Sequence, residues 1–197
     1  MNREEFLARW EADPFLKKAE LIEGVVYLPS PVSVPHGAYD SPLHLWLGLY
    51  RIRTPGCQIL ANVTWMLLDS SPQPDIAMRR LPEAGGLSTT TAKGDYPVGP
   101  AELVVEICRS SRSYDLGPKL ALYLKAGVPE YLAVLVEEQR VEWRILEGDR
   151  YVLLAPDTDG LLKSRVFPGL WLDPKALLGE DLAALAAAVE LGLQSRS

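Results

Sequence analysis

Three residues have the types and the spacing of a divalent-metal site. Glu106 lies inside the apolar run 103–108, which is rich in β-branched residues and predicts a buried strand. A buried polar group without a partner costs about 2–7 kcal/mol, so Glu106 must meet a compensating group. Asp75 opens an earlier apolar stretch, and Lys119 follows in a segment with helical spacing. Two carboxylates suit Mg²⁺ or Mn²⁺, whose bound water a nearby lysine can orient or deprotonate for attack on a phosphoryl group.

Each of these residues also has a simpler interpretation. Asp75 follows Pro74 and suits a turn, Glu106 suits a buried partner of an arginine, and Lys119 suits a helix flank whose charged end reaches solvent. Taken singly, the simpler interpretations are favoured. Taken together, the order is that of metal-dependent nucleases: an acid at a strand start, an acid within an apolar strand, then a basic residue.

Two strands and one helix must position this set. We expect strands at 75–79 and from 103, and a helix over 116–126 with Asp115 as its N-cap. Steps of about 100° per residue place Lys119 beside the apolar face of that helix and Lys125 on the opposite, solvated side.

The remaining pattern predicts an α/β fold, in which a central mixed β-sheet is flanked by helices and accompanied by further antiparallel strands. The segment 82–100 is rich in Gly, Thr, Ala and Pro and predicts a long flexible loop. No linker divides the chain, so we expect a single domain over 1–197. The other expected elements are helices at 3–12, 36–53 and 180–193 and strands at 20–28, 58–61, 64–68, 130–136, 140–146 and 151–154.

Composition narrows the class of protein. The chain has 197 residues, of which 48% are hydrophobic, enough for a real core. The net charge of −6 argues against a protein that coats nucleic acid. Cys57 and Cys108 lie in apolar sequence and are expected to be buried thiols. No signal peptide or membrane span is evident, so we expect a cytoplasmic protein.

Several motifs resemble one family closely. They include Ser30-Pro31 with His36, Pro74-Asp75 and Ser110-Ser111. Longer matching stretches lie at 20–27, 102–107, 114–123 and 126–131. Together they resemble the Uma-two family, which is assigned to the PD-(D/E)XK restriction-endonuclease-like superfamily, and the resemblance covers nearly the whole chain.

The resemblance implies roles for individual residues. Asp75 and Glu106 would bind Mg²⁺ or Mn²⁺, and Glu20 matches an extra acid that supports the metal site in many superfamily members. The superfamily usually has a lysine two residues after the second acid, where this chain has Cys108. Lys119, on the following helix, would replace that lysine.

Other matching positions carry weaker expectations. Glu23 lies in the turn at Gly24, and His36 is expected to be a surface or capping residue rather than a catalytic one. Arg109 stands where family members often have a serine or an acid. The strand at 132–136 also lacks the aspartate that is usual at its end. Neither departure removes the metal site, although both leave the substrate and the level of activity open.

The function expected from these features is a metal-dependent endodeoxyribonuclease. It would hydrolyse phosphodiester bonds through a metal-activated water, with DNA as partner, and we expect a homo-oligomer without membrane attachment. The alternative is a catalytically inactive, oligomeric DNA-binding or protein-interaction module with the same fold. For that module, the tryptophans and the C-terminal helix around Leu182, Leu185 and Leu191 offer interface material. A hydrolase using Ser110 or Ser111 ranks last, because the chain lacks a Gly-x-Ser-x-Gly elbow there.

Overall fold

A six-stranded mixed sheet forms the centre of the protein. The computed structural model describes residues 1–16, 18–28 and 30–196. Strands β7 and β8 run parallel, and the other neighbouring pairs run antiparallel. This is the predicted central mixed sheet. In spatial order the strands are β10 (Arg150–Leu153), β9 (Arg140–Glu147), β8 (Glu130–Leu135), β7 (Leu103–Cys108), β4 (Ile76–Arg80) and β3 (Cys57–Ala61).

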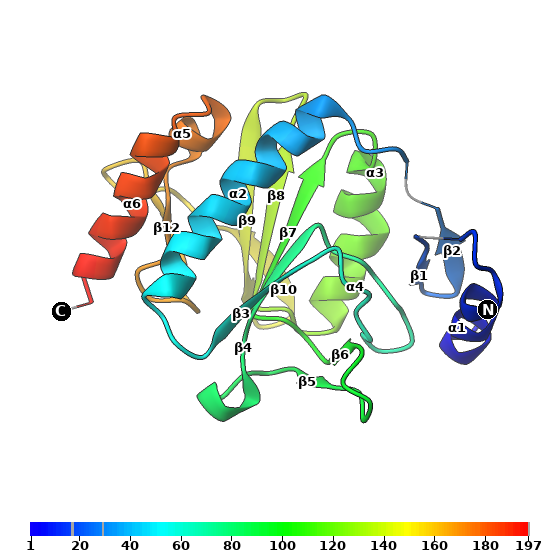
Figure 1. The fold of residues 1–197 in the computed structure, drawn as a ribbon. Coiled ribbons are helices and arrows are strands. Elements are labelled where there is room, and N and C mark those ends of the chain that lie inside the picture. The colour runs from blue at the N-terminus through cyan, green and yellow to red at the C-terminus, as the bar shows by residue number, and fades with distance from the viewer. Residues whose placement is uncertain (17, 29, 197) are drawn as a thin grey trace.

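Helices cover both faces of this sheet (Figure 1). One face packs against α2 (Val34–Ile52), α5 (Pro174–Leu178) and α6 (Leu182–Gln194). On the other face, α3 (Arg112–Tyr114) continues through a widened helical turn, η2 (Asp115–Lys119), into α4 (Leu120–Lys125).

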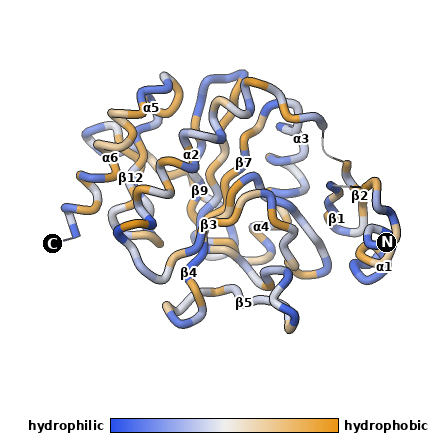
Figure 2. Tube along the Cα trace, viewed as in Figure 1, coloured by the Kyte–Doolittle hydropathy of each residue, from blue (hydrophilic) through white to orange (hydrophobic). Residues whose placement is uncertain are grey.

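The two faces follow from the alternation of side chains along β7. Leu103, Val105 and Ile107 join the core beneath α2, while Val104 and Cys108 join the core beneath α4. Figure 2 shows that hydrophobic residues are concentrated along this strand. Glu106 shares the α4 face, so its carboxylate points toward the helix that carries Lys119.

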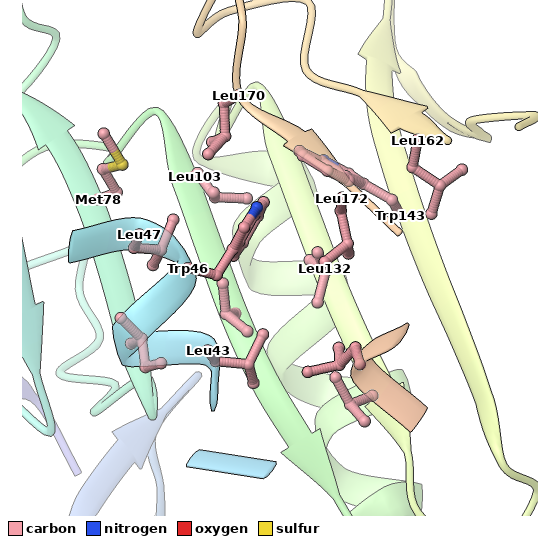
Figure 3. Close-up of a cluster of buried hydrophobic side chains, with 14 of the residues drawn as sticks. Leu43, Trp46, Leu47, Met78, Leu103, Leu132, Trp143, Leu162, Leu170 and Leu172 are labelled. Carbon is pink, nitrogen blue, oxygen red and sulfur yellow. The ribbon is translucent and has the colours of Figure 1, made fainter. Parts of the chain in front are cut away.

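The larger core centres on an aromatic pair. The rings of Trp46 and Trp143 meet edge to face with centroids 5.6 Å apart, and leucines from the strands and from α2 surround them (Figure 3). Trp46 Nε1 also donates a hydrogen bond to the carbonyl of Trp171. These contacts fix α2 against the sheet and therefore fix the beginning of α2 relative to β4 and β7.

Smaller elements surround the sheet. At one end, α1 (Arg3–Ala12) packs with a hairpin of β1 (Glu20–Ile22) and β2 (Val25–Tyr27). Further antiparallel pairs, which agree with the expected additional strands, join β5 (Thr89–Thr90) to β6 (Pro97–Val98) and β11 (Leu162–Lys163) to β12 (Trp171–Leu172). Among the described helices, none is long and apolar enough to cross a membrane.

Three predicted elements differ from the structure. The stretch 20–28 is a hairpin rather than one strand, because Glu23 and Gly24 both adopt positive φ and reverse the chain. The stretch 64–68 is not a regular strand and makes only isolated bridges at Met66 and Leu67. The predicted long loop 82–100 contains a 3₁₀ turn, η1 (Pro82–Ala84), and the β5–β6 pair.

Hydrogen bonds to two buried polar side chains explain why the segment 82–100 is structured. The carboxylate of Glu102 accepts hydrogen bonds from the backbone N–H groups of Arg80 and Leu87, and the side chain of Arg79 donates to the carbonyl of Thr89. These contacts hold Leu87 and Thr89, in the first half of the segment, to β4 and to the residue that precedes β7. Composition alone does not reveal such long-range contacts.

Asp115 is not an N-cap, because the helix begins upstream at Arg112. Its backbone is helical, and its side chain turns toward Lys119 instead. The two cysteines are buried and free, as expected.

Candidate metal centre

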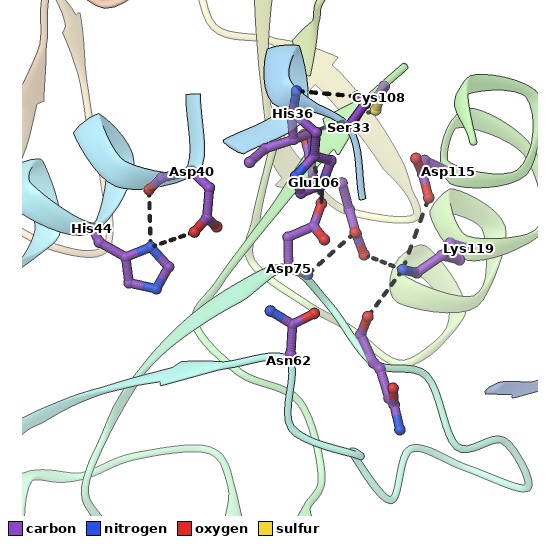
Figure 4. Close-up of polar contacts among 12 residues, drawn as sticks. Ser33, His36, Asp40, His44, Asn62, Asp75, Glu106, Cys108, Asp115 and Lys119 are labelled. Carbon is purple, nitrogen blue, oxygen red and sulfur yellow. Dashed lines mark hydrogen bonds and ion pairs between the residues drawn. The ribbon is translucent and has the colours of Figure 1, made fainter. Parts of the chain in front are cut away.

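The four predicted site residues come together at one place in the fold. Asp75 immediately precedes β4, Glu106 lies within β7, Lys119 ends η2, and Glu20 begins β1. Because β4 pairs with β7, the backbone N–H of Ile107 donates to Asp75 Oδ2 at 2.8 Å, and the nitrogen of Asp75 lies 3.4 Å from Glu106 Oε2 (Figure 4). Sheet pairing therefore fixes the relative position of the two acids.

Lys119 lies at the centre of a ring of oxygen atoms. Its Nζ is 2.6 Å from Glu106 Oε1, 3.4 Å from Glu20 Oε2 and 3.8 Å from Asp115 Oδ1. It also donates to the backbone carbonyl of Gln73 at 3.3 Å. Lys119 and Glu106 are only 2% and 1% exposed, so this pair is removed from bulk water.

The charges of this pair depend on one another. Burial alone would lower the pKa of Lys119, but the carboxylates of Glu106, Glu20 and Asp115 raise it well above its ordinary value. Burial raises the pKa of Glu106 well above its ordinary value, and the ammonium of Lys119 opposes that rise. The surrounding carboxylates therefore favour the charged form of Lys119, and its positive charge in turn favours ionised Glu106.

Glu20 belongs to the Lys119 side of the cluster. Its Oε2 accepts from the backbone N–H of Gln73 at 3.1 Å and from the hydroxyl of Tyr114 at 3.1 Å. The same oxygen faces Lys119. These contacts hold the carboxylate of Glu20 beside the ammonium of Lys119.

One side of Glu106 is committed to protein contacts. Its Oε1 accepts from the hydroxyl of Tyr123 at 3.0 Å as well as from Lys119. Its Oε2 faces the backbone of Asp75 instead. Asp75 and Glu106 both line a pocket of about 260 Å³.

The donor set fits one kind of metal. Mg²⁺ and Mn²⁺ are commonly held by one or two carboxylates, with water and substrate phosphate completing the coordination shell. In the part of the chain that the structure describes, no group of three His, Cys, Asp or Glu side chains is arranged to hold a metal ion. The pair Asp75 and Glu106 therefore suits a partly hydrated ion rather than a closed structural zinc site.

His36 lines the same pocket and lies beside Asp75, and the expectation that it could cap the helix is wrong. The cap of α2 is Ser33, whose Oγ accepts from the backbone N–H of His36. His36 Nε2 lies 3.3 Å from Asp75 Oδ2, and its Nδ1 is buried without a hydrogen-bond partner within the described part of the chain. The hydrogen bond with Asp75 raises the pKa of His36.

Four further residues of the cluster were not predicted as site residues, and the sequence contains a usable signal for only one of them, Asp115. Asp115 and Lys119 are four residues apart, a helical spacing that brings side chains together. The contacts of His36, Tyr114 and Tyr123 join elements distant in sequence, so spacing could not predict them. Glu23 lies outside the cluster, in the β1–β2 turn, 3.5 Å from Lys125 Nζ.

Comparisons with known proteins agree with this architecture. The sequence model of the Uma2 family, described as "Putative restriction endonuclease", matches residues 3–175. A crystal structure described as that of "a putative nuclease belonging to DUF820" from Anabaena variabilis ATCC 29413 superposes with a TM-score of 0.71 at 18% identity. The superposition covers 91% of this chain and 98% of the other, and at this identity it shows a shared fold. No curated protein matches the chain.

Proposed function

Because the chain belongs to the Uma2 family of restriction-endonuclease-like proteins, we propose that it is a metal-dependent endodeoxyribonuclease. Asp75 and Glu106 hold Mg²⁺ or Mn²⁺ in this proposal, and DNA is the substrate. The observation that carries it is the placement of one carboxylate just before β4 and the other within its partner strand β7, with the buried ammonium of Lys119 2.6 Å from Glu106.

A bound divalent ion supplies a water of lowered pKa and neutralises charge on the phosphodiester. The protein contributes geometry and charge. Asp75 is held by the N–H of Ile107, and Glu106 is held by Lys119 and Tyr123, so both carboxylates are oriented before substrate binds. Hydrolysis would form one P–O bond from the oxygen of water and break the P–O bond to the leaving oxygen, which gains a proton from solvent as the attacking water releases one to solvent. The positive charge of Lys119 would favour the negative charge that develops on the phosphoryl group.

The second candidate is an inactive, oligomeric DNA-binding or protein-interaction module with the same fold. It is favoured by the close pairing of Lys119 with Glu106, since buried ion pairs also occur as structural contacts. The C-terminal helix gives the inactive module less support than the sequence indicated, because its described residues offer no continuous apolar surface for a subunit interface. Leu185 is buried in the core, and the exposed Leu182 and Leu191 lie on opposite sides of the helix at its 3.6-residue period.

Metal binding and cleavage distinguish the two candidates. The nuclease proposal expects calorimetric titration with Mn²⁺ to show binding that Asp75→Asn abolishes and Asp149→Asn, in the exposed β9–β10 turn, preserves. It also expects cleavage of supercoiled plasmid only when Mg²⁺ or Mn²⁺ is present. Absence of metal binding would favour the inactive module, whose oligomeric state light scattering would then report.

A further inference from the structure

Resting on the nuclease function proposed above, we infer that the pocket binds an unpaired nucleotide. The phosphodiester lies at Asp75 and Glu106, and the face of the base lies against Tyr27, Leu28 and Val32. These last three residues lie along the chain between the end of β2 and the start of α2, and all three line the pocket. We call them the apolar wall.

The apolar wall and the acids line the same pocket. Leu28 and Val32 are each 68% exposed, which is a high exposure for large aliphatic side chains beside a cluster of charged groups. Apolar side chains that line a pocket together with a few polar groups commonly mark a ligand site. A ligand for this pocket therefore combines an anionic part with a flat or apolar part, as a nucleotide does.

Tyr27 is held in place before any ligand arrives. Its ring lies against the ring of Tyr114, with centroids 4.2 Å apart and an angle of 34° between the planes. The hydroxyl of Tyr114 is anchored in turn by Glu20. A fixed aromatic ring costs little entropy on binding and is a common platform for nucleobases.

Positive charge lies on the same pocket. Lys18 Nζ contacts the neutral side chain of Asn62 at 2.9 Å, and Arg109 pairs with the exposed carboxylate of Glu137 at 3.0 Å. Both Lys18 and Arg109 line the pocket and can contact phosphates that flank the bound nucleotide. Cations that follow a backbone, combined with aromatic and apolar side chains for the bases, are the usual features of single-strand binding sites.

Duplex DNA does not use this combination of groups. In a duplex the faces of the bases are stacked on one another, and the grooves present only base edges. An unpaired base exposes its face and can lie against the apolar wall while its phosphate reaches the acids. The pocket volume of about 260 Å³ is also close to the lower end of small-molecule sites, which suits a single nucleotide unit.

Fluorescence anisotropy with a labelled single strand and with its own duplex tests this inference. The titrations contain Ca²⁺, which takes carboxylate and phosphate oxygens as ligands, and denaturing gels run afterwards show that the strands are intact, so binding is measured apart from cleavage. We expect the single strand to bind about tenfold tighter than the duplex. We expect Leu28→Ser/Val32→Ser to weaken single-strand binding by about tenfold, because the base then loses two apolar contacts. The matched control Leu153→Ser/Leu191→Ser removes two exposed leucines away from the pocket and should change neither affinity.

Two results would overturn the inference. One is equal or tighter binding of the duplex by the wild-type protein. The other is unchanged single-strand binding by Leu28→Ser/Val32→Ser, which would assign the apolar wall to a protein partner or to no ligand. A protein that shows the single-strand preference but never cleaves DNA would contradict the nuclease function and not the pocket, so the two failures are distinguishable.

Discussion

Lys119 Nζ lies 2.6 Å from Glu106 Oε1, and this contact joins a helical turn on one layer to a central strand of the sheet. Both side chains are buried, and each compensates the charge of the other. Removing Lys119 alone leaves the charge of Glu106 uncompensated in the interior. Removing both partners avoids that charge, but Glu20 and Asp115 still lose their cation. The pair therefore links the fold of the protein to the electrostatics of its site.

Lys119→Met should lower the free energy of unfolding by about 3–5 kcal/mol, because it leaves Glu106 buried without its cation. Lys119→Met/Glu106→Leu should recover part of that loss while remaining inactive, since Glu20 and Asp115 still lack their cation in both variants. Urea denaturation of the wild type, the single variant and the double variant measures the difference. Equal destabilisation in the single and double variants would show that the two charges are not coupled.

His36 should position Asp75 for metal binding through its Nε2 contact. His36→Ala should weaken Mn²⁺ binding by about 10–100-fold, the usual loss for a group that orients a metal ligand. His36→Gln keeps a nitrogen donor at the end of the side chain and should restore much of the affinity. Calorimetry measures both constants.

His44→Ala is the matched control, because His44 lies on the same helix but contacts the carbonyl of Asp40 instead. It should bind Mn²⁺ like the wild type. Equal Mn²⁺ affinity in His36→Ala and the wild type would show that His36 does not position Asp75 for metal binding.

Asp115 should make stability depend on pH. Burial raises the pKa of Asp115 to about 6, and its Oδ2 has no hydrogen-bond partner in the described part of the chain. Since the folded pKa exceeds the unfolded value, Asp115 costs no stability at pH below the unfolded value. It becomes destabilising as the pH rises through about 6.

The stability of Asp115→Asn relative to the wild type should therefore increase by about 2–3 kcal/mol between about pH 4 and pH 8. Denaturant titrations at both pH values measure this difference. A stability difference that does not change with pH would show that Asp115 is as easily ionised in the folded protein as in the unfolded one.

The sequence predicted the strand that follows Asp75 and the strand that contains Glu106, because apolar, β-branched runs indicate buried strands. The helical period likewise predicted that Lys119 borders the core and that Lys125 is solvated, as the structure shows. The contact of His36 with Asp75 could not be predicted this way, since it depends on how α2 packs across the sheet. The order in 82–100 depends similarly on the buried carboxylate of Glu102, which lies outside that segment.

Cleavage of supercoiled plasmid by wild type, Asp75→Asn and Asp149→Asn from identical purifications is the most direct test of the central claim. Negative supercoiling favours local strand separation and so offers unpaired nucleotides to the pocket. We expect the wild type and Asp149→Asn to cut when Mg²⁺ or Mn²⁺ is present and not in EDTA, and Asp75→Asn to remain folded without cutting. Metal-dependent cutting by Asp75→Asn at the wild-type rate would contradict the account.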